Sequence, residues 1–171
     1  QRLRLAQEVG GDTLAAYADK LGFTSSHSLD GIPTLAGRFD KAPAGSANLS
    51  WSGIGQYNDL VCPYSMLRLV SAIGNGGTFP EPTLLGHSSV DKPTSLISAD
   101  TAQRMKEFMS YNVKNSYGTG TFPGLFICAK SGTAEVGDGN THAWFTGFLD
   151  DLDHPYAFVV VIENGGGGLR N

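Results

Sequence analysis

The sequence has few charged residues, few cysteines and no long hydrophobic run. Charged side chains make up 16% of the 171 residues, which excludes an acidic disordered tail and a coiled coil. The formal net charge of -4 offers no basic surface for phosphates, so we expect no nucleic-acid partner. The longest apolar run, residues 156–162, is far shorter than the ~20 residues of a membrane-spanning helix.

Metal and cofactor motifs are also lacking. Cys62 and Cys128 have no metal-ligand spacing and no neighbouring histidine, so we expect two buried free thiols. The acidic residues Asp150, Asp151 and Asp153 are too few for a calcium loop and indicate a solvated turn. The glycines of residues 165–168 are not followed by the Lys-[Ser/Thr] of a phosphate-binding loop. We therefore predict no metal and no cofactor.

Helix signals dominate the first part of the chain, which already reads as helical at residues 1–5. Asp12 is a candidate N-cap for a helix that ends before Gly22, and Pro63 can begin a second helix. Ser98 is a candidate cap for a third helix. The side chains of that helix expected to face the core are Ala102, Met105, Phe108 and Met109. Residues 23–57 show no period and are expected to be irregular.

Strand signals dominate the last part. Residues 125–131, 142–149 and 156–163 are short apolar runs, rich in β-branched or aromatic residues and separated by turn residues. The connections are too short for crossover helices, so the strands are expected to be antiparallel neighbours. The sequence therefore predicts an α+β fold in which helices pack on a small antiparallel sheet.

A Lys-Ser-Gly motif follows the first predicted strand. Lys130, Ser131 and Gly132 end an apolar run, and two further strands come after them. The tripeptide alone is weak evidence because it also arises by chance. Its position is more informative, since the edge of a sheet can accept an extended peptide as an added strand.

Several segments together resemble the penicillin-binding transpeptidases of the bacterial cell wall, whose third active-site motif is Lys-[Thr/Ser]-Gly on a strand edge. The resemblance covers about residues 5–168. It implies a β-lactamase/transpeptidase-like fold and an acyl-serine enzyme that cross-links peptidoglycan and is inhibited by β-lactams. The segments that carry it are residues 52–56 (SGIGQ), Pro63, residues 72–77 (AIGNGG), Pro82, residues 130–135 (KSGTAE), residues 142–148 (HAWFTGF) and residues 161–166 (VIENGG).

Each residue of the motif has a chemical reason to be there. Lys130 can place a cation at the C-terminal carboxylate of a ligand, and Ser131 adds a hydroxyl donor. Gly132 lacks a side chain where the ligand backbone approaches. By resemblance, the backbone N–H of Thr133 forms half of an oxyanion hole, so Lys130 and Thr133 are the predicted catalytic residues. His142 is expected to be a hydrogen-bonded structural residue and not a base.

The other two motifs of the family are Ser-x-x-Lys and Ser-x-Asn, and neither has a convincing counterpart here. Ser89 and Lys92 have the first spacing, but Lys92 precedes a proline in a loop-like stretch. Ser46 and Asn48 have the second spacing but stand in the wrong order and place. We therefore expect residues 1–171 to be the C-terminal portion of a transpeptidase domain, inactive alone, with its nucleophile upstream.

The resemblance leaves three functions open. The first is a peptidoglycan D,D-transpeptidase, the second is a serine β-lactamase, and the third is a non-catalytic β-lactam sensor. For the first, the implied partners are stem peptides, β-lactams, the N-terminal part of the same domain, and other cell-wall or division proteins that act on cell shape. The implied location is the extracytoplasmic face of the bacterial membrane, held by an N-terminal anchor absent from this chain.

Overall fold

The computed structural model describes residues 2–86, 92–118, 120–137 and 139–167. The chain forms two compact units, Gln1–Ser65 and Met66–Asn171, and each is described by itself. Within the described residues, no helix is long and apolar enough to cross a membrane.

The first unit is mainly helical. Its elements are α1 (Arg2–Val9), α2 (Gly11–Lys20), the hairpin strands β1 (Ser28–Leu29) and β2 (Ile32–Pro33), and α3 (Ala47–Ser52). Ala6, Ala18 and Leu49 are buried in this unit. A Cβ added at Gly53 would collide with the Cβ of Ala6, so the end of α3 packs directly on α1.

Two predictions for this unit are wrong. Asp12 lies in the first turn of α2 and does not cap it; the N-cap is Gly10, with a φ of 85°. A carboxylate in the first turn still interacts favourably with the helix dipole, which explains the misleading signal. The predicted irregular stretch contains a hairpin and α3, whose cap is the Ser46 hydroxyl, which accepts from the Leu49 N–H at 3.2 Å. A helix of under two turns shows no readable period.

Asp59 is a partly buried carboxyl group in the first unit. Its Oδ2 accepts a 2.8 Å hydrogen bond from the Ser52 hydroxyl, while its Oδ1 is buried and has no hydrogen-bond partner among the described residues. Burial is the largest cause that raises the pKa of Asp59, and the nearby charge of Asp40 adds to it, while hydrogen bonds from Ser52 and from the Asp40 backbone lower it. The net result is a pKa of about 6. The ionised form of Asp59 is therefore unfavourable in the folded chain.

Replacing Asp59 with asparagine is expected to stabilise the chain at neutral pH. The folded pKa lies above the ordinary value of 3.8, so the free energy of unfolding falls as pH rises from about 4 to 6. Asp59→Asn keeps an oxygen for Ser52 and removes the charge, which after discounting for solvent is worth about 1 kcal/mol, or ~2–4 °C. Thermal melts should show this gain at pH 7.5 and none at pH 4. The exposed Asp153→Asn is the control; a loss of stability at both pH values would contradict the assignment.

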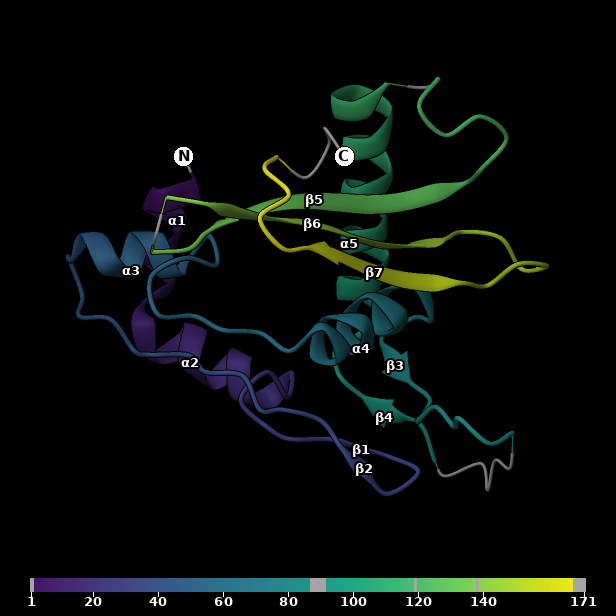
Figure 1. Cartoon of the computed structure of the whole chain (residues 1–171), viewed down its shortest axis with the longest axis horizontal. Coiled ribbons are helices and arrows are strands. Elements are labelled where there is room, and N and C mark those ends of the chain that lie inside the picture. The colour runs from purple at the N-terminus through teal and green to yellow at the C-terminus, as the bar shows by residue number, and fades with distance from the viewer. Residues whose placement is uncertain (1, 87–91, 119, 138, 168–171) are drawn as a thin grey trace. The chain divides into compact units, whose positions relative to one another are not determined.

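The second unit contains the three predicted strands. Its sheet has the order β5-β6-β7, and both pairs are antiparallel as predicted. Figure 1 shows the three strands side by side with α5 crossing behind them. The elements in chain order are α4 (Pro63–Gly74, which begins in the first unit), β3 (Thr78–Phe79), β4 (Thr94–Ser95), α5 (Ala99–Asn112), the π-helical turn η1 (Val113–Tyr117), β5 (Ile127–Glu135), β6 (Thr141–Leu149) and β7 (Ala157–Ile162).

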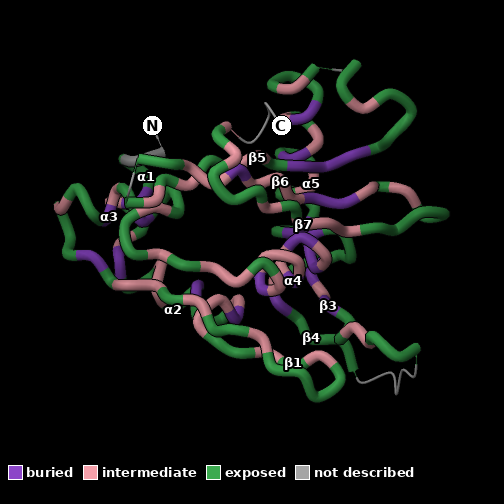
Figure 2. Tube along the Cα trace, in the orientation of Figure 1, coloured by how far each residue is buried: buried purple, intermediate pink, exposed green. Residues whose placement is uncertain are grey.

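Both faces of the sheet are covered by apolar side chains. Cys128 and Phe148 lie on one face and form a buried cluster with residues of α4 and with Met109 of α5. Ile127 and Ala129 lie on the other face and pack with Val113, which begins η1. Side chains alternate between the two faces of a strand. Met109 of α5 packs on one face and Val113 of η1 packs on the other, so the chain passes beside the outer edge of β5 between these two residues. Figure 2 shows the buried segments of α5 and β5 next to one another.

The predicted core face of α5 is only half right. Ala102 and Met109 are buried, but Met105 is 38% exposed and Phe108 is 69% exposed. The buried line runs through Ala102, Met109 and Val113, and Phe108 stands about 100° around the helix from Met109. Met105 and Phe108 are apolar but not buried, so hydrophobicity alone did not identify the buried residues of α5.

The cysteines are free thiols, as predicted. Cys128 is buried, and burial raises the pKa of its thiol, which keeps it protonated and unreactive. Cys62 is only half-buried, so that part of the prediction is wrong. Pro63 begins α4 as predicted.

Candidate ligand-binding site on β5

The Lys-Ser-Gly motif lies inside β5 and not at its end. The strand continues through the motif to Glu135, because every residue from Ile127 to Glu135 pairs with β6. Ser131 pairs with Phe145 and Thr133 pairs with Ala143, so these two side chains share one face. Lys130 and Gly132 point to the opposite face. Because β5 pairs with β6 alone among the described strands, the motif lies on an outer strand, as predicted.

The outer edge of β5 is identified by two side-chain hydrogen bonds. The Ser131 N–H donates to the Tyr117 hydroxyl at 2.6 Å, and Asn112 Nδ2 donates to the Ala129 carbonyl at 3.1 Å. Backbone groups of alternate residues in an antiparallel strand point to the same side. The Thr133 N–H therefore points to the same outer edge as the Ser131 N–H, which is where a ligand can meet it.

A cation and a hydroxyl lie together at this edge. The exposed Lys130 Nζ donates to the Ser131 carbonyl at 2.5 Å, which folds the long side chain back toward the strand. The Ser131 Oγ accepts from the Tyr117 hydroxyl at 3.1 Å. The two side chains leave opposite faces of β5, and the contact of Lys130 Nζ with the Ser131 carbonyl brings the ammonium group to the outer edge. Ammonium and hydroxyl groups are both donors that suit a carboxylate. The structure thus brings the predicted binding groups of Lys130 and Ser131 to one region of β5.

The structure gives a packing reason for glycine at position 132, besides the predicted one. A Cβ at Gly132 would lie 3.3 Å from the Cβ of its cross-strand partner Trp144, which is tighter than ordinary packing. The glycine therefore lets Trp144 lie against β5. Gly147 has a similar role, since a Cβ there would collide with the Cys128 carbonyl. The approach of a ligand backbone at Gly132 stays a prediction.

The remaining conspicuous residues have structural roles. His142 Nδ1 accepts from the Asn164 N–H at 3.1 Å, which confirms its role as a hydrogen-bonded residue. Glu135 is exposed. Asp150 is not merely solvated: it forms a 2.6 Å ion pair with Lys106 of α5. Of the described residues, no three His, Cys, Asp or Glu side chains are grouped so that they could hold a metal ion.

The structure also bears on the two rejected motifs. The Ser46 hydroxyl caps α3 and donates to the Pro43 carbonyl at 2.6 Å, and Asn48 lies within that helix. This confirms a local structural role for Ser46. In the other motif, Ser89 lies outside the described residues. Lys92 is the first residue of the described segment 92–118.

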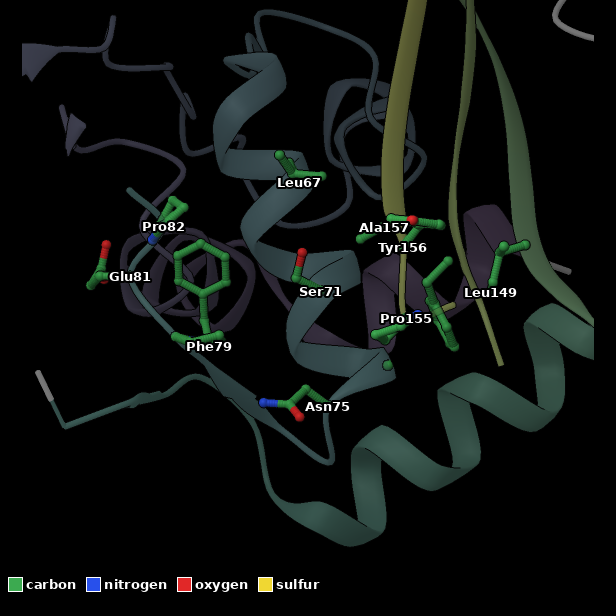
Figure 3. Close-up of a pocket in the computed structure, with 13 residues that line it drawn as sticks. Leu67, Ser71, Asn75, Phe79, Glu81, Pro82, Leu149, Pro155, Tyr156 and Ala157 are labelled. Carbon is green, nitrogen blue, oxygen red and sulfur yellow. The ribbon is translucent and has the colours of Figure 1, made fainter. Parts of the chain in front are cut away.

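The second unit has a pocket of about 470 Å³ that is separate from the motif. Figure 3 shows Ser71 of α4 and Asn75, which directly follows that helix, lying between Phe79 on one side and the start of β7 on the other. Glu81 lines the pocket, and its carboxylate pairs with Arg68 at 3.6 Å. None of Lys130, Ser131, Gly132 or Thr133 lines this pocket, so it is not the predicted ligand site.

Sequence reasoning missed two residues of the β5 edge. Asn112 and Tyr117 are 17 and 14 residues away from the groups that they bond. Both follow the last periodic residues of α5, and no motif marks them. Only the helix end passing beside the strand brings them to the edge.

Comparison with known proteins identifies the class. The sequence profile of the penicillin binding protein transpeptidase domain matches residues 3–171. The chain therefore belongs to this family, and the α+β prediction is confirmed.

Similar proteins come from mycobacteria and from Pseudomonas aeruginosa. The chain is 26% identical over 178 residues to the peptidoglycan D,D-transpeptidase PbpA of Mycobacterium tuberculosis. That alignment covers 95% of this chain and 36% of PbpA. The imipenem acyl-enzyme of penicillin-binding protein A from M. tuberculosis superposes with a TM-score of 0.84 at 27% identity, over 96% of this chain and 40% of that one. Pseudomonas aeruginosa PBP2, in complex with WCK 5153, gives a TM-score of 0.80 at 26% identity, over 99% of this chain and 43% of that one. The chain thus spans well under half the length of these proteins.

Proposed function

We propose that this chain forms the Lys-Ser-Gly portion of a serine D,D-transpeptidase that cross-links peptidoglycan and is acylated by β-lactams. The observation that carries the proposal is the position of Lys130, Ser131 and the Thr133 N–H along one outer strand. The similarity to PbpA proteins and to β-lactam acyl-enzymes of penicillin-binding protein A supports it. The nucleophilic serine belongs to a part of the domain outside this chain.

The geometry of β5 suits each step assigned to it. An extended stem peptide can lie along the outer edge as an added strand. Its C-terminal carboxylate is bound by the Lys130 ammonium and the Ser131 hydroxyl. The attacked carbonyl oxygen then points at the Thr133 N–H, which stabilises the negative charge that develops when the serine attacks. The leaving D-alanine departs, and the acyl group passes from the serine to the amine of a second stem peptide.

We also propose the setting in which this activity operates. The complete protein acts at the extracytoplasmic face of the bacterial membrane, where peptidoglycan is assembled, and is held there by an anchor. Its partners are stem peptides, the remainder of the transpeptidase domain, and cell-wall or division proteins. The chain contributes the binding strand and half of the oxyanion hole.

Labelling with a fluorescent penicillin tests the proposal. The complete protein should give a covalent band on denaturing electrophoresis, and the 171-residue chain alone should give none, because the acyl-enzyme needs a nucleophile and its base. Thermal melting of the isolated chain controls for folding. No band from the folded complete protein would refute the function. A band from the chain alone that Ser89→Ala abolishes would instead identify Ser89 as the nucleophile.

A further inference from the structure

Tyr117 bonds both polar groups of Ser131 that lie at the outer edge of β5. Its hydroxyl accepts the Ser131 N–H at 2.6 Å and donates to the Ser131 Oγ at 3.1 Å. A phenol has one hydrogen to donate and can accept as well, so a single hydroxyl satisfies both contacts. The contact falls on the middle residue of the Lys-Ser-Gly motif.

The Tyr117 ring is held by packing, which fixes the position of its hydroxyl. The half-buried side chain packs against the cluster of Val113, Ile127 and Ala129, and its ring centroid lies 6.0 Å from that of Phe145. Tyr117 ends the π-helical turn η1, which closes with the Gly118 N–H donating to the Val113 carbonyl at 3.1 Å. Such wide turns are frequent at functional sites.

We propose that Tyr117 is a positioning residue for ligands of this site, an inference that rests on the proposed function. Its hydroxyl closes the edge of β5 at Ser131 and orients the Ser131 hydroxyl toward the ligand carboxylate. Two consequences follow, one for the register of the ligand and one for the recognition of its carboxylate.

The first consequence is the register of the ligand. An added strand pairs with alternating N–H and C=O groups along the edge. Asn112 bonds the Ala129 carbonyl and Tyr117 bonds the Ser131 N–H, so these groups are satisfied within the chain. An extended ligand is directed to the part of β5 beyond the Ser131 N–H. This keeps its reacting carbonyl near Thr133.

The second consequence is the direction of the Ser131 hydroxyl. Because the Tyr117 hydroxyl donates to Ser131 Oγ, the hydrogen of Ser131 remains available to donate elsewhere. Lys130 Nζ lies 2.5 Å from the Ser131 carbonyl, so the cation and the Ser131 hydroxyl are both held at this residue of β5. Loss of the Tyr117 hydroxyl leaves the Ser131 hydroxyl free to rotate away.

The test uses Tyr117→Phe, which keeps the ring and removes the hydroxyl, with Tyr111→Phe at an exposed position of α5 as the matched control. In the complete protein, acylation rates are measured with penicillin G and with its methyl ester. Tyr117→Phe should slow acylation by penicillin G about three- to tenfold, the effect of one hydrogen bond, and should change the acylation rate with the ester little.

The second readout uses the 171-residue chain. In the Tyr117→Phe variant, site-resolved hydrogen exchange at the Ser131 amide should become at least ~10-fold faster. Tyr111→Phe should change neither quantity.

The two readouts separate the possible failures. Equal loss with penicillin G and its ester would indicate a merely structural role and overturn the proposal, as would wild-type rates for both. Unchanged exchange at Ser131 would show that Tyr117 does not close the edge. If the unmodified complete protein is not acylated at all, the proposed function fails and the carboxylate role fails with it, while the exchange result still decides whether Tyr117 holds the strand.

Discussion

Replacing Thr133 with proline in the complete protein is expected to slow penicillin acylation by about 10²–10³-fold, the usual effect of losing one oxyanion donor. The Thr133 N–H points to the outer edge of β5 and not toward β6, so proline removes the proposed oxyanion donor without removing a bond of the β5–β6 ladder. Thr133→Ala keeps the backbone N–H and is expected to have a mild effect. Acylation rates of the two variants, compared with the unmodified protein, give the measurement.

The contrast between these two variants identifies the group that acts. Thermal melting must show that both are folded, since proline also restricts the backbone conformation at its own and the preceding residue. If both fold and Thr133→Ala is as slow as Thr133→Pro, the side chain and not the backbone carries the role. The oxyanion assignment at Thr133 would then be wrong.

Replacing Lys130 with alanine is expected to slow acylation about ten- to a hundredfold. The substitution removes a charge-assisted contact to the ligand carboxylate, which is worth roughly 1.5–3 kcal/mol. The exposed Lys130 lies on the outer strand, and its hydrogen bond to the Ser131 carbonyl is the contact that the substitution removes among the described residues, so folding should persist. The rate is measured with penicillin G, with thermal melting as the check on folding.

A matched variant separates the local contact from the overall charge. Lys114→Ala removes the same charge from an exposed position of η1 and should leave the rate unchanged. The penicillin methyl ester lacks the carboxylate, so Lys130→Ala should affect it much less. Equal rates for Lys130→Ala and the unmodified protein with penicillin G would exclude a role for Lys130 in carboxylate binding.

The elements that sequence reasoning found share strong local signals. Pro63 marks the start of α4 because its fixed φ suits the first turn, and Ser98 caps α5 with its hydroxyl on the Thr101 N–H at 3.1 Å. The three strands were visible because short apolar runs alternate with turn residues. The short hairpins and α3 were missed because elements of two to six residues have too few positions to show a period.

The sequence by itself determined the α+β class, the antiparallel order of the last three strands and the motif from Lys130 to Thr133, because these depend on residues close together in the chain. The tertiary structure alone decided which side chains lie at the outer edge of β5. Asn112 and Tyr117 reach Ala129 and Ser131 because the end of α5 passes beside that strand. Contacts between residues far apart in the chain depend on how helix and sheet pack, and no local pattern encodes them.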